Sequence, residues 1–176
     1  MKVFFAGAQG TGKTTLINIV ETGLEKIQGI TRKTIKNGSS INENGDTNTQ
    51  DEIFKAYSKA FEDKDNFISE RGLIDVFSYS MYLYEKGKMD HAVMQNHYEG
   101  LKSYHEKNKD IVYFYLPPEF PIENDGTRSV DPEYQKYIDR YISKSLEWAE
   151  QQGSKVYRIT GSIEERKQKI EEIMNQ

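Results

Sequence analysis

Eight residues near the start of the chain constrain its fold more than any other feature. They match the pattern G-x-x-x-x-G-K-[ST] and read Gly7-Ala8-Gln9-Gly10-Thr11-Gly12-Lys13-Thr14. A mostly apolar run precedes them and a helical pattern follows them, which is the strand–loop–helix context of this motif. The glycines let backbone N–H groups turn inward without a Cβ clash. Because those N–H groups and the helix start form a nest for anions, the segment predicts a phosphate-binding loop.

The side chains of this loop suit a nucleoside triphosphate. Lys13 can reach the terminal phosphates as a mobile point charge. The Thr14 hydroxyl suits Mg²⁺, which keeps most of its waters and takes few protein ligands. We expect the whole segment and the next residue to contact the nucleotide, namely Gly7, Ala8, Gln9, Gly10, Thr11, Gly12, Lys13, Thr14 and Thr15.

Length and composition narrow the class of protein. A chain of 176 residues is long enough for one domain with a proper core, and we expect one domain over 1–176. The net charge of −4 disfavours a protein that holds duplex nucleic acid by its phosphates. The absence of cysteine excludes disulfides, zinc–thiolate sites and thiol nucleophiles. The apolar runs are too short for a membrane span or a signal peptide, so we expect a cytoplasmic protein with no membrane partner.

Strand and helix patterns alternate along the rest of the chain. After the first strand, Lys2–Ala6, we predict strands at Ile30–Ile35, Asn66–Ser69, Ile111–Leu116 and Lys155–Ile159. The helices between them are predicted from the phosphate loop to Gly29, from a capping box at Thr49–Glu52, over Leu73–Lys86 and Asp90–Glu106, after Asp131-Pro132, and from Ser162. This alternation predicts an α/β protein of three layers with a five-stranded, mostly parallel sheet flanked by helices.

The phosphate loop alone does not say what is done with the nucleotide. A GTPase needs a D-x-x-G switch and an N-K-x-D base reader, and the sequence has neither. An oligomeric ATPase motor needs a strand of four apolar residues ending in Asp-Glu, which is also missing. A small-molecule kinase needs a carboxylate near the acceptor hydroxyl, arginines for the phosphoryl charge and a loop that excludes water.

Glu70 and Arg71 supply the carboxylate and the first arginine. They follow the strand Asn66–Ser69, and ligands of an open parallel sheet sit at the carboxyl ends of its strands. If this strand neighbours the first one, Glu70 lies near Mg²⁺ and the acceptor, and Arg71 near the transferred phosphate. An ordinary ion pair at a strand end is the alternative. Asp75 is either a second acidic group of the site or an acid favoured by the helix dipole.

Four motifs in this order resemble the landmarks of nucleoside and nucleoside-monophosphate kinases. They are Gly7–Thr14, Glu70-Arg71-Gly72, Asp125–Arg128 and Ile159–Ser162. The chain is most similar to small P-loop kinases grouped with thymidylate kinase and with the ribosylnicotinamide kinase domain, many of them phage-encoded. This resemblance implies the P-loop NTPase fold with strand order 2-3-1-4-5, and ATP and Mg²⁺ as cofactors.

The resemblance also assigns roles to residues. It implies a lid at about 117–130 that carries Arg128, and a loop at Gly161-Ser162 that packs on adenine. The catalytic residues would be Lys13, Glu70, Arg71 and Arg128, and the Mg²⁺ ligands Thr14 and Glu70. Family members often carry a carboxylate at the end of the second strand. The predicted second strand has none, which leaves more of the acid–base role to Glu70.

The acceptor side is less defined by the sequence. Arg32 is a candidate ligand for an acceptor phosphate, together with Arg71. Phe54 and Tyr57 face the acceptor in the implied fold, where either ring could stack on a base or pack in the core. The three histidines, His91, His97 and His105, lack metal-ligand spacing, and we expect them on a helix surface.

These observations favour phosphoryl transfer from ATP to a small nucleotide-type acceptor. A (deoxy)nucleoside monophosphate is favoured, because Arg32 and Arg71 offer partners for its phosphate. A nucleoside or other small metabolite, a polynucleotide 5′-end and a non-catalytic nucleotide-binding role remain alternatives. A homodimer is possible, and no duplex nucleic acid is expected as a partner.

Overall fold

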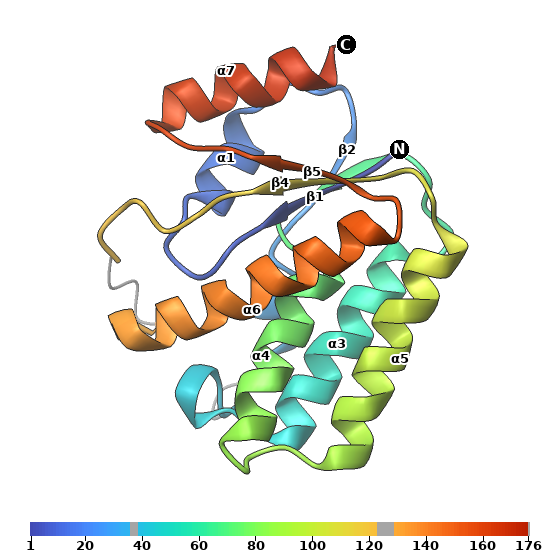
Figure 1. Ribbon diagram of the computed structural model, residues 1–176, viewed down its shortest axis with the longest axis vertical. Helices are drawn as coiled ribbons and strands as arrows, with labels where there is room; N and C mark the ends of the chain where they lie inside the picture. The colour runs from blue at the N-terminus through green and yellow to red at the C-terminus, as the bar shows by residue number, and fades with distance from the viewer. Residues whose placement is uncertain (36–38, 123–128, 176) are drawn as a thin grey trace.

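The computed structural model describes residues 1–35, 39–122 and 129–175, and a five-stranded parallel sheet forms its centre (Figure 1). The strands are β1 (Lys2–Ala6), β2 (Glu25–Ile27), β3 (Phe67–Ser69), β4 (Ile111–Tyr115) and β5 (Lys155–Arg158). Their order is β2-β3-β1-β4-β5, with every neighbouring pair parallel. This order and the fold class of the P-loop NTPases are therefore confirmed.

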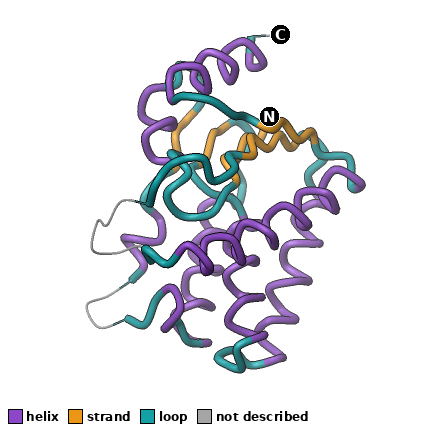
Figure 2. The backbone as a smooth tube through the Cα atoms, turned by 60° about the vertical axis from the view of Figure 1, so that its left-hand side comes forward, coloured by secondary structure: helices purple, strands orange, loops and turns teal. Residues whose placement is uncertain are grey.

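Helices cover both faces of the sheet, as the ribbon and the rotated tube show (Figures 1 and 2). One face carries α1 (Lys13–Ile19) and α7 (Ile163–Met174), and the other carries α3 (Thr47–Phe61), α4 (Leu73–Glu85), α5 (His91–Lys107) and α6 (Pro132–Gln151). A short helix, α2 (Ile30–Thr34), and a 3₁₀ turn, η1 (Asn42–Asn44), precede α3. Because both faces are covered, the central strands β1 and β4 are buried along their whole length.

The core is divided by the sheet. Alternate residues of β1 point to opposite faces, so Phe4 packs on the α3–α6 side and Phe5 on the α1–α7 side. The Phe4 ring meets the rings of Phe61 and Phe67 edge-on, with centroids 5.1 and 5.4 Å away. This aromatic packing fixes β1 and β3 side by side, and the two residues that follow β3 are Glu70 and Arg71.

The prediction for the second strand was wrong. Residues Ile30–Thr34 form α2, and the strand lies earlier, at Glu25–Ile27, where it pairs with β3. The first helix ends at Ile19 instead of continuing to Gly29, because the chain turns through Gly23 (φ 68°) before entering β2. The longer helix was predicted because Leu24 and Ile27 continue the helical spacing of Leu16 and Val20, although they lie beyond the end of α1.

The start of α3 was also misplaced. Its N-cap is Asp46, whose carboxylate accepts a hydrogen bond of 2.8 Å from the Thr49 N–H. The helix thus begins ahead of the predicted capping box, because an aspartate satisfies the first free N–H groups as well as a threonine does. The other predicted elements agree with the observed bounds to within a few residues.

Part of the predicted lid, residues 123–128 with Arg128, lies outside the described residues. In the portion that is described, no helix has the length and apolar character needed to cross a membrane.

Candidate active site

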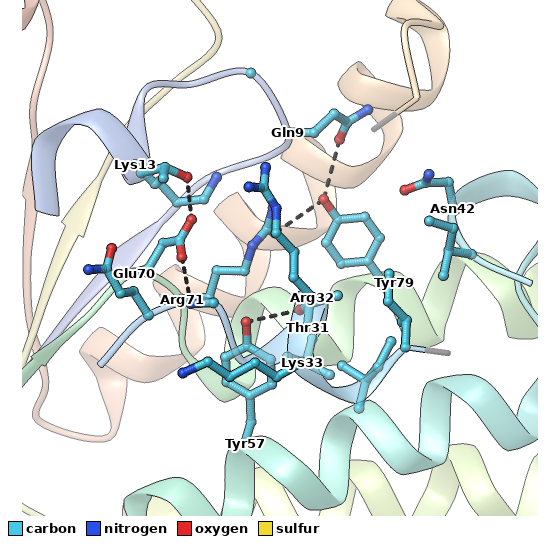
Figure 3. Close-up of a pocket in the computed structure, with 18 of the residues that line it drawn as sticks. Gln9, Lys13, Thr31, Arg32, Lys33, Asn42, Tyr57, Glu70, Arg71 and Tyr79 are labelled. Atoms are coloured by element: carbon cyan, nitrogen blue, oxygen red, sulfur yellow. Dashed lines mark hydrogen bonds between the residues drawn. The ribbon is translucent and has the colours of Figure 1, made fainter. Parts of the chain in front are cut away.

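A cavity of about 430 Å³ opens where the phosphate loop, the segment after β2 and the end of β3 meet. Residues 9–15 of the phosphate loop form one end of it. The other end is formed by α2, by Gln50 and Tyr57 of α3, and by Tyr79 of α4. Glu70 and Arg71 lie between the two ends, and Figure 3 shows their side chains beside Lys13 and Arg32. The fold therefore joins a phosphate-binding end and a side-chain-rich end in one space.

The phosphate loop adopts the conformation that its glycines permit. Gly10 and Gly12 have φ values of 76° and 88°, in the left-handed region that other residues avoid. Lys13 curls back over its own loop, where its Nζ donates to the carbonyl oxygens of Gly7 and Ala8. The lysine charge thus lies against the loop that precedes α1.

Asp75, on α4, holds the first residue of this loop in place. It is fully buried, and its carboxylate accepts hydrogen bonds from the N–H groups of Gly7 (3.0 Å) and Gly72 (3.2 Å). Burial raises the pKa of Asp75, against the opposing charges of Lys13 and Arg71. Asp75 therefore acts both as a first-turn acid of α4 and as a link between the phosphate loop and the start of that helix.

Glu70 joins the two ends of the cavity. One carboxylate oxygen accepts a hydrogen bond from the Thr14 hydroxyl, and the other accepts one of 3.2 Å from the Gly29 N–H. Burial works to raise the pKa of Glu70, but the Thr14 hydrogen bond and the Arg71 charge outweigh it and lower that pKa. Glu70 is therefore ionised at neutral pH.

The adjacent oxygens of Thr14 and Glu70 fit Mg²⁺. A hydroxyl and a carboxylate are hard oxygen ligands, and Mg²⁺ takes only one or two protein groups beside waters and phosphates. These two residues would hold the ion, and its contribution would be to offset phosphate charge.

Arg71 points toward the phosphate loop from the end of β3 (Figure 3). Its Nη1 donates to the Tyr79 hydroxyl (3.3 Å), which in turn donates to Gln9 Oε1 (3.3 Å). Burial works against the Arg71 charge, but the nearby Tyr79, Tyr57 and acidic groups raise its pKa. A guanidinium is therefore held permanently charged next to the loop.

The two aromatic residues proposed for the acceptor lie in different places. Tyr57 lines the cavity, and its hydroxyl is 3.1 Å from the Thr31 hydroxyl of α2. Burial raises the pKa of Tyr57 to about 12, so the phenol stays protonated. Phe54 does not line the cavity and instead stacks on His97, with centroids 4.1 Å apart. The structure thus brings Tyr57 to the site and leaves Phe54 in the core.

A family model described as an AAA domain matches residues 2–166. The chain belongs to this family. No curated protein matches it.

Solved structures similar to this AAA-domain protein share its fold at low identity. Deoxyadenosine kinase from M. mycoides with the products dCMP and dCDP bound is 14% identical with a TM-score of 0.68, over 99% of this chain and 98% of that one. The Bacillus subtilis YorR protein in complex with phosphorylated GDP is 15% identical with a TM-score of 0.60, over 99% and 96%. The NadR protein in complex with NR is 14% identical with a TM-score of 0.66, and this chain covers 50% of it.

Gly161 and Ser162 of the AAA-domain protein do not line the cavity. Gly161 donates its N–H to Glu119 (3.0 Å) and Ser162 caps α7. Arg166 connects the loop at Gly161 with the phosphate loop and with Glu119. It is fully buried, and the sequence did not predict its role. Its guanidinium donates to the carbonyl oxygens of Thr11 (3.0 Å) and Gly161 (2.9 Å), and to the Glu119 carboxylate (2.6 Å). No local pattern marks it, because its partners lie far apart in the sequence.

The expectation for the histidines was wrong for two of the three. His97 and His105 are only 1% and 2% exposed, because α5 packs one face against α3 and the sheet. His105 Nδ1 lies 2.9 Å from the Leu101 carbonyl oxygen, and its Nε2 lies 3.0 Å from the Tyr113 hydroxyl.

The position after the observed second strand carries Gln28 in this AAA-domain protein. The second strand lies earlier than predicted, and the residue that follows it also lacks a carboxylate.

Arg140, on α6, lines a separate cavity of about 740 Å³ together with Arg158 and Lys144. Arg140 consequently does not contribute to the cavity around the phosphate loop.

Proposed function

We propose that this AAA-domain protein transfers a phosphoryl group from ATP, with Mg²⁺, to a small nucleotide-type acceptor, most favourably a (deoxy)nucleoside monophosphate. The observation that carries this proposal is the single cavity that joins the phosphate loop to Glu70, Arg71 and Arg32. A nucleotide-binding module needs only the first end. The second end gives an acceptor a place within reach of the phosphates.

In this proposal each group of the site has a defined task, and Glu70 has two. Lys13 and the loop amides hold the β- and γ-phosphates, and Thr14 and Glu70 hold Mg²⁺. Arg71 and Arg128 offset charge on the transferred group, while Gly161 and Ser162 pack near the adenine once the lid closes. Arg32 binds a phosphate of the acceptor, and Tyr57 forms a wall of its binding space.

The charge state of Glu70 shapes its part in the chemistry. Its lowered pKa makes it a weak base, so beside holding Mg²⁺ its task is to orient the acceptor hydroxyl by accepting its hydrogen bond. Phosphoryl transfer tolerates this, because its transition state depends more on positioning and charge than on early proton removal.

The bound molecules of the similar structures support a small acceptor. They include dCMP, dATP, dCTP, phosphorylated GDP and NR. NR lacks the acceptor phosphate that Arg32 would bind, so a nucleoside is the second candidate. The acidic chain gives no support to a polynucleotide 5′-end.

The test incubates the protein with ATP, Mg²⁺ and each member of a panel of nucleosides and nucleoside monophosphates. Mass spectrometry then detects the phosphorylated products. We expect at least one monophosphate to gain one phosphate. Phosphorylation of nucleosides alone would move the assignment to the second candidate. ATP binding without any phosphorylated acceptor would favour a non-catalytic module and refute the proposal.

A further inference from the structure

A chain of buried polar side chains runs from the molecular surface to the acceptor end of the cavity. It crosses three helices, from Asp51 on α3 to His97 on α5, then to Ser80 on α4 and back to Gln50 on α3. His97, Ser80 and Gln50 are at most 7% exposed, and Gln50 lines the cavity. Buried polar groups are costly unless paired, so a fully connected chain beside a binding space points to a role there.

The last link fixes the Gln50 amide. Gln50 Nε2 donates to the Val76 carbonyl oxygen (2.9 Å) and to Ser80 Oγ (3.1 Å). A carbonyl oxygen can only accept, so the nitrogen of the amide must face Val76. Both N–H hydrogens are then used on α4, and the Gln50 oxygen is the atom left for the cavity.

The earlier links hold Ser80 in the required orientation. The Asp51 carboxylate lies 3.2 Å from His97 Nε2, which places the ring proton on that nitrogen. His97 Nδ1 then accepts the hydrogen bond of the Ser80 hydroxyl, 2.9 Å away. The Ser80 hydroxyl also lies 3.1 Å from the Val76 carbonyl oxygen, but its one proton goes to His97 Nδ1, because that nitrogen carries no proton of its own. Ser80 therefore presents its lone pairs to Gln50.

The surroundings of His97 keep this arrangement neutral. Burial lowers the pKa of His97, while Asp51 raises it and Lys55 lowers it. Phe54 covers the ring face at an interplanar angle of 6°, which restricts its rotation. For Phe54 this stack favours core packing, one of the two alternatives that the sequence left open.

We propose that His97 and Ser80 are positioning residues that lock Gln50 with its carbonyl oxygen toward the cavity, so that the acceptor is bound through an exocyclic amino group of its base. An oxygen fixed in this way accepts a hydrogen bond from an amino N–H. A base without that group leaves the buried oxygen unpaired, and sites of this kind reject such analogues. The inference rests on the proposed function only in taking the ligand of this end to be a nucleoside or nucleotide.

The test compares binding of matched nucleosides by calorimetry, without ATP. Adenosine is paired with purine riboside and cytidine with pyrimidin-2-one riboside, and each pair differs only by the amino group. The same pairs are measured as 5′-monophosphates, because the proposed function gives the acceptor a phosphate. In the unmodified protein we expect the preferred amino nucleoside to bind about tenfold more tightly than its partner. Equal binding within every pair, or no binding of any nucleoside or monophosphate of the set, would overturn the inference.

Variants then separate positioning from simple packing. Ser80→Ala should reduce the preference at least threefold, and His97→Phe, which keeps the stack on Phe54, should act in the same direction. Ser78→Ala is the matched control, because Ser78 is equally buried on α4 but donates to the Ile74 carbonyl oxygen. A preference unchanged in Ser80→Ala, or lost equally in Ser78→Ala, would contradict the proposal. Gln50→Leu should abolish the preference even if the other variants fold poorly.

The binding assay also distinguishes this inference from the proposed function. A preserved amino preference without phosphoryl transfer would refute the proposed function alone. Phosphoryl transfer with no amino preference would refute the positioning role alone.

Discussion

The two ends of the cavity are built in different ways. The phosphate end is built of backbone, and buried side chains from distant elements hold that backbone in place. Asp75 holds Gly7, Gln135 holds the Gln9 carbonyl oxygen at 2.7 Å, and Arg166 holds Thr11. The acceptor end is lined by side chains, which come from α2, α3, α4 and the residues after β3.

This difference separates what is shared from what is specific. A nest of N–H groups binds any terminal phosphate, whatever nucleoside carries it. Under the proposed function, the side chains at the acceptor end bind one particular acceptor. Their hydrogen bonds within the protein decide which of their atoms face that acceptor. Changes at the phosphate end should therefore affect every substrate, and changes at the acceptor end should affect one substrate more than another.

The largest effect is expected from Lys13→Ala. Without the charge that the loop holds over the phosphates, we expect phosphoryl transfer to fall by at least about 1,000-fold with every acceptor. Steady-state rates measure it, with Lys26→Ala as a control because Lys26 lies outside the cavity on β2. Near-normal activity would show that the loop does not carry the transferred phosphate.

Arg166→Leu should destabilise the protein by removing the side chain that holds the phosphate end in place. The substitution removes three hydrogen bonds and leaves the Thr11 and Gly161 carbonyl oxygens without this donor, so we expect the free energy of unfolding to fall by about 3 kcal/mol. Urea denaturation measures it, and Arg140→Leu, an exposed residue, serves as the control. A loss below about 1 kcal/mol would mean that the loop does not need this support.

Glu70→Gln acts where the two ends meet. The substitution keeps the shape of the side chain but removes the negative charge of the carboxylate, which accepts the hydrogen bond of the Thr14 hydroxyl. We expect turnover to fall about 100-fold. The control is Glu62→Gln, at the exposed end of α3. A fall of less than tenfold would remove the role of Glu70 in orienting the acceptor.

A smaller effect concerns pH and the acceptor end. Burial lowers the pKa of His97 below its ordinary value of 6.5, so the unfolded chain binds this proton more readily than the folded one. Stability should then rise with pH between the lowered pKa and about 6.5, and fall as the pH drops through that window. Urea denaturation from pH 7.5 to 5.0 should show a shallower dependence for His97→Phe than for the unmodified protein. Parallel curves would place the ring in a solvated environment.

The sequence predicted the phosphate end better than the acceptor end for a physical reason. The phosphate loop is one local segment whose glycines and lysine act together, so its pattern is readable. Glu70 and Arg71 line the cavity as predicted, because β3 ends just before them. No local pattern marks the buried contacts of Arg166, Gln50 and His97, since most of their partners are distant in the sequence.

The misplaced second strand has a similar cause. Three residues are too few to show a strand pattern, and their apolar neighbours continued the spacing of the preceding helix. Pairing with β3 decides the position of this strand. Arg32 was therefore assigned to the right region of the cavity but to the wrong type of element.

The most direct test of the account is ADP release with and without the acceptor that the panel identifies. If one cavity serves both ends, ADP release should rise at least about tenfold when the acceptor is added, with one phosphorylated acceptor formed for each ADP. Equal ADP release in the presence and absence of every acceptor, with no phosphorylated product, would contradict it.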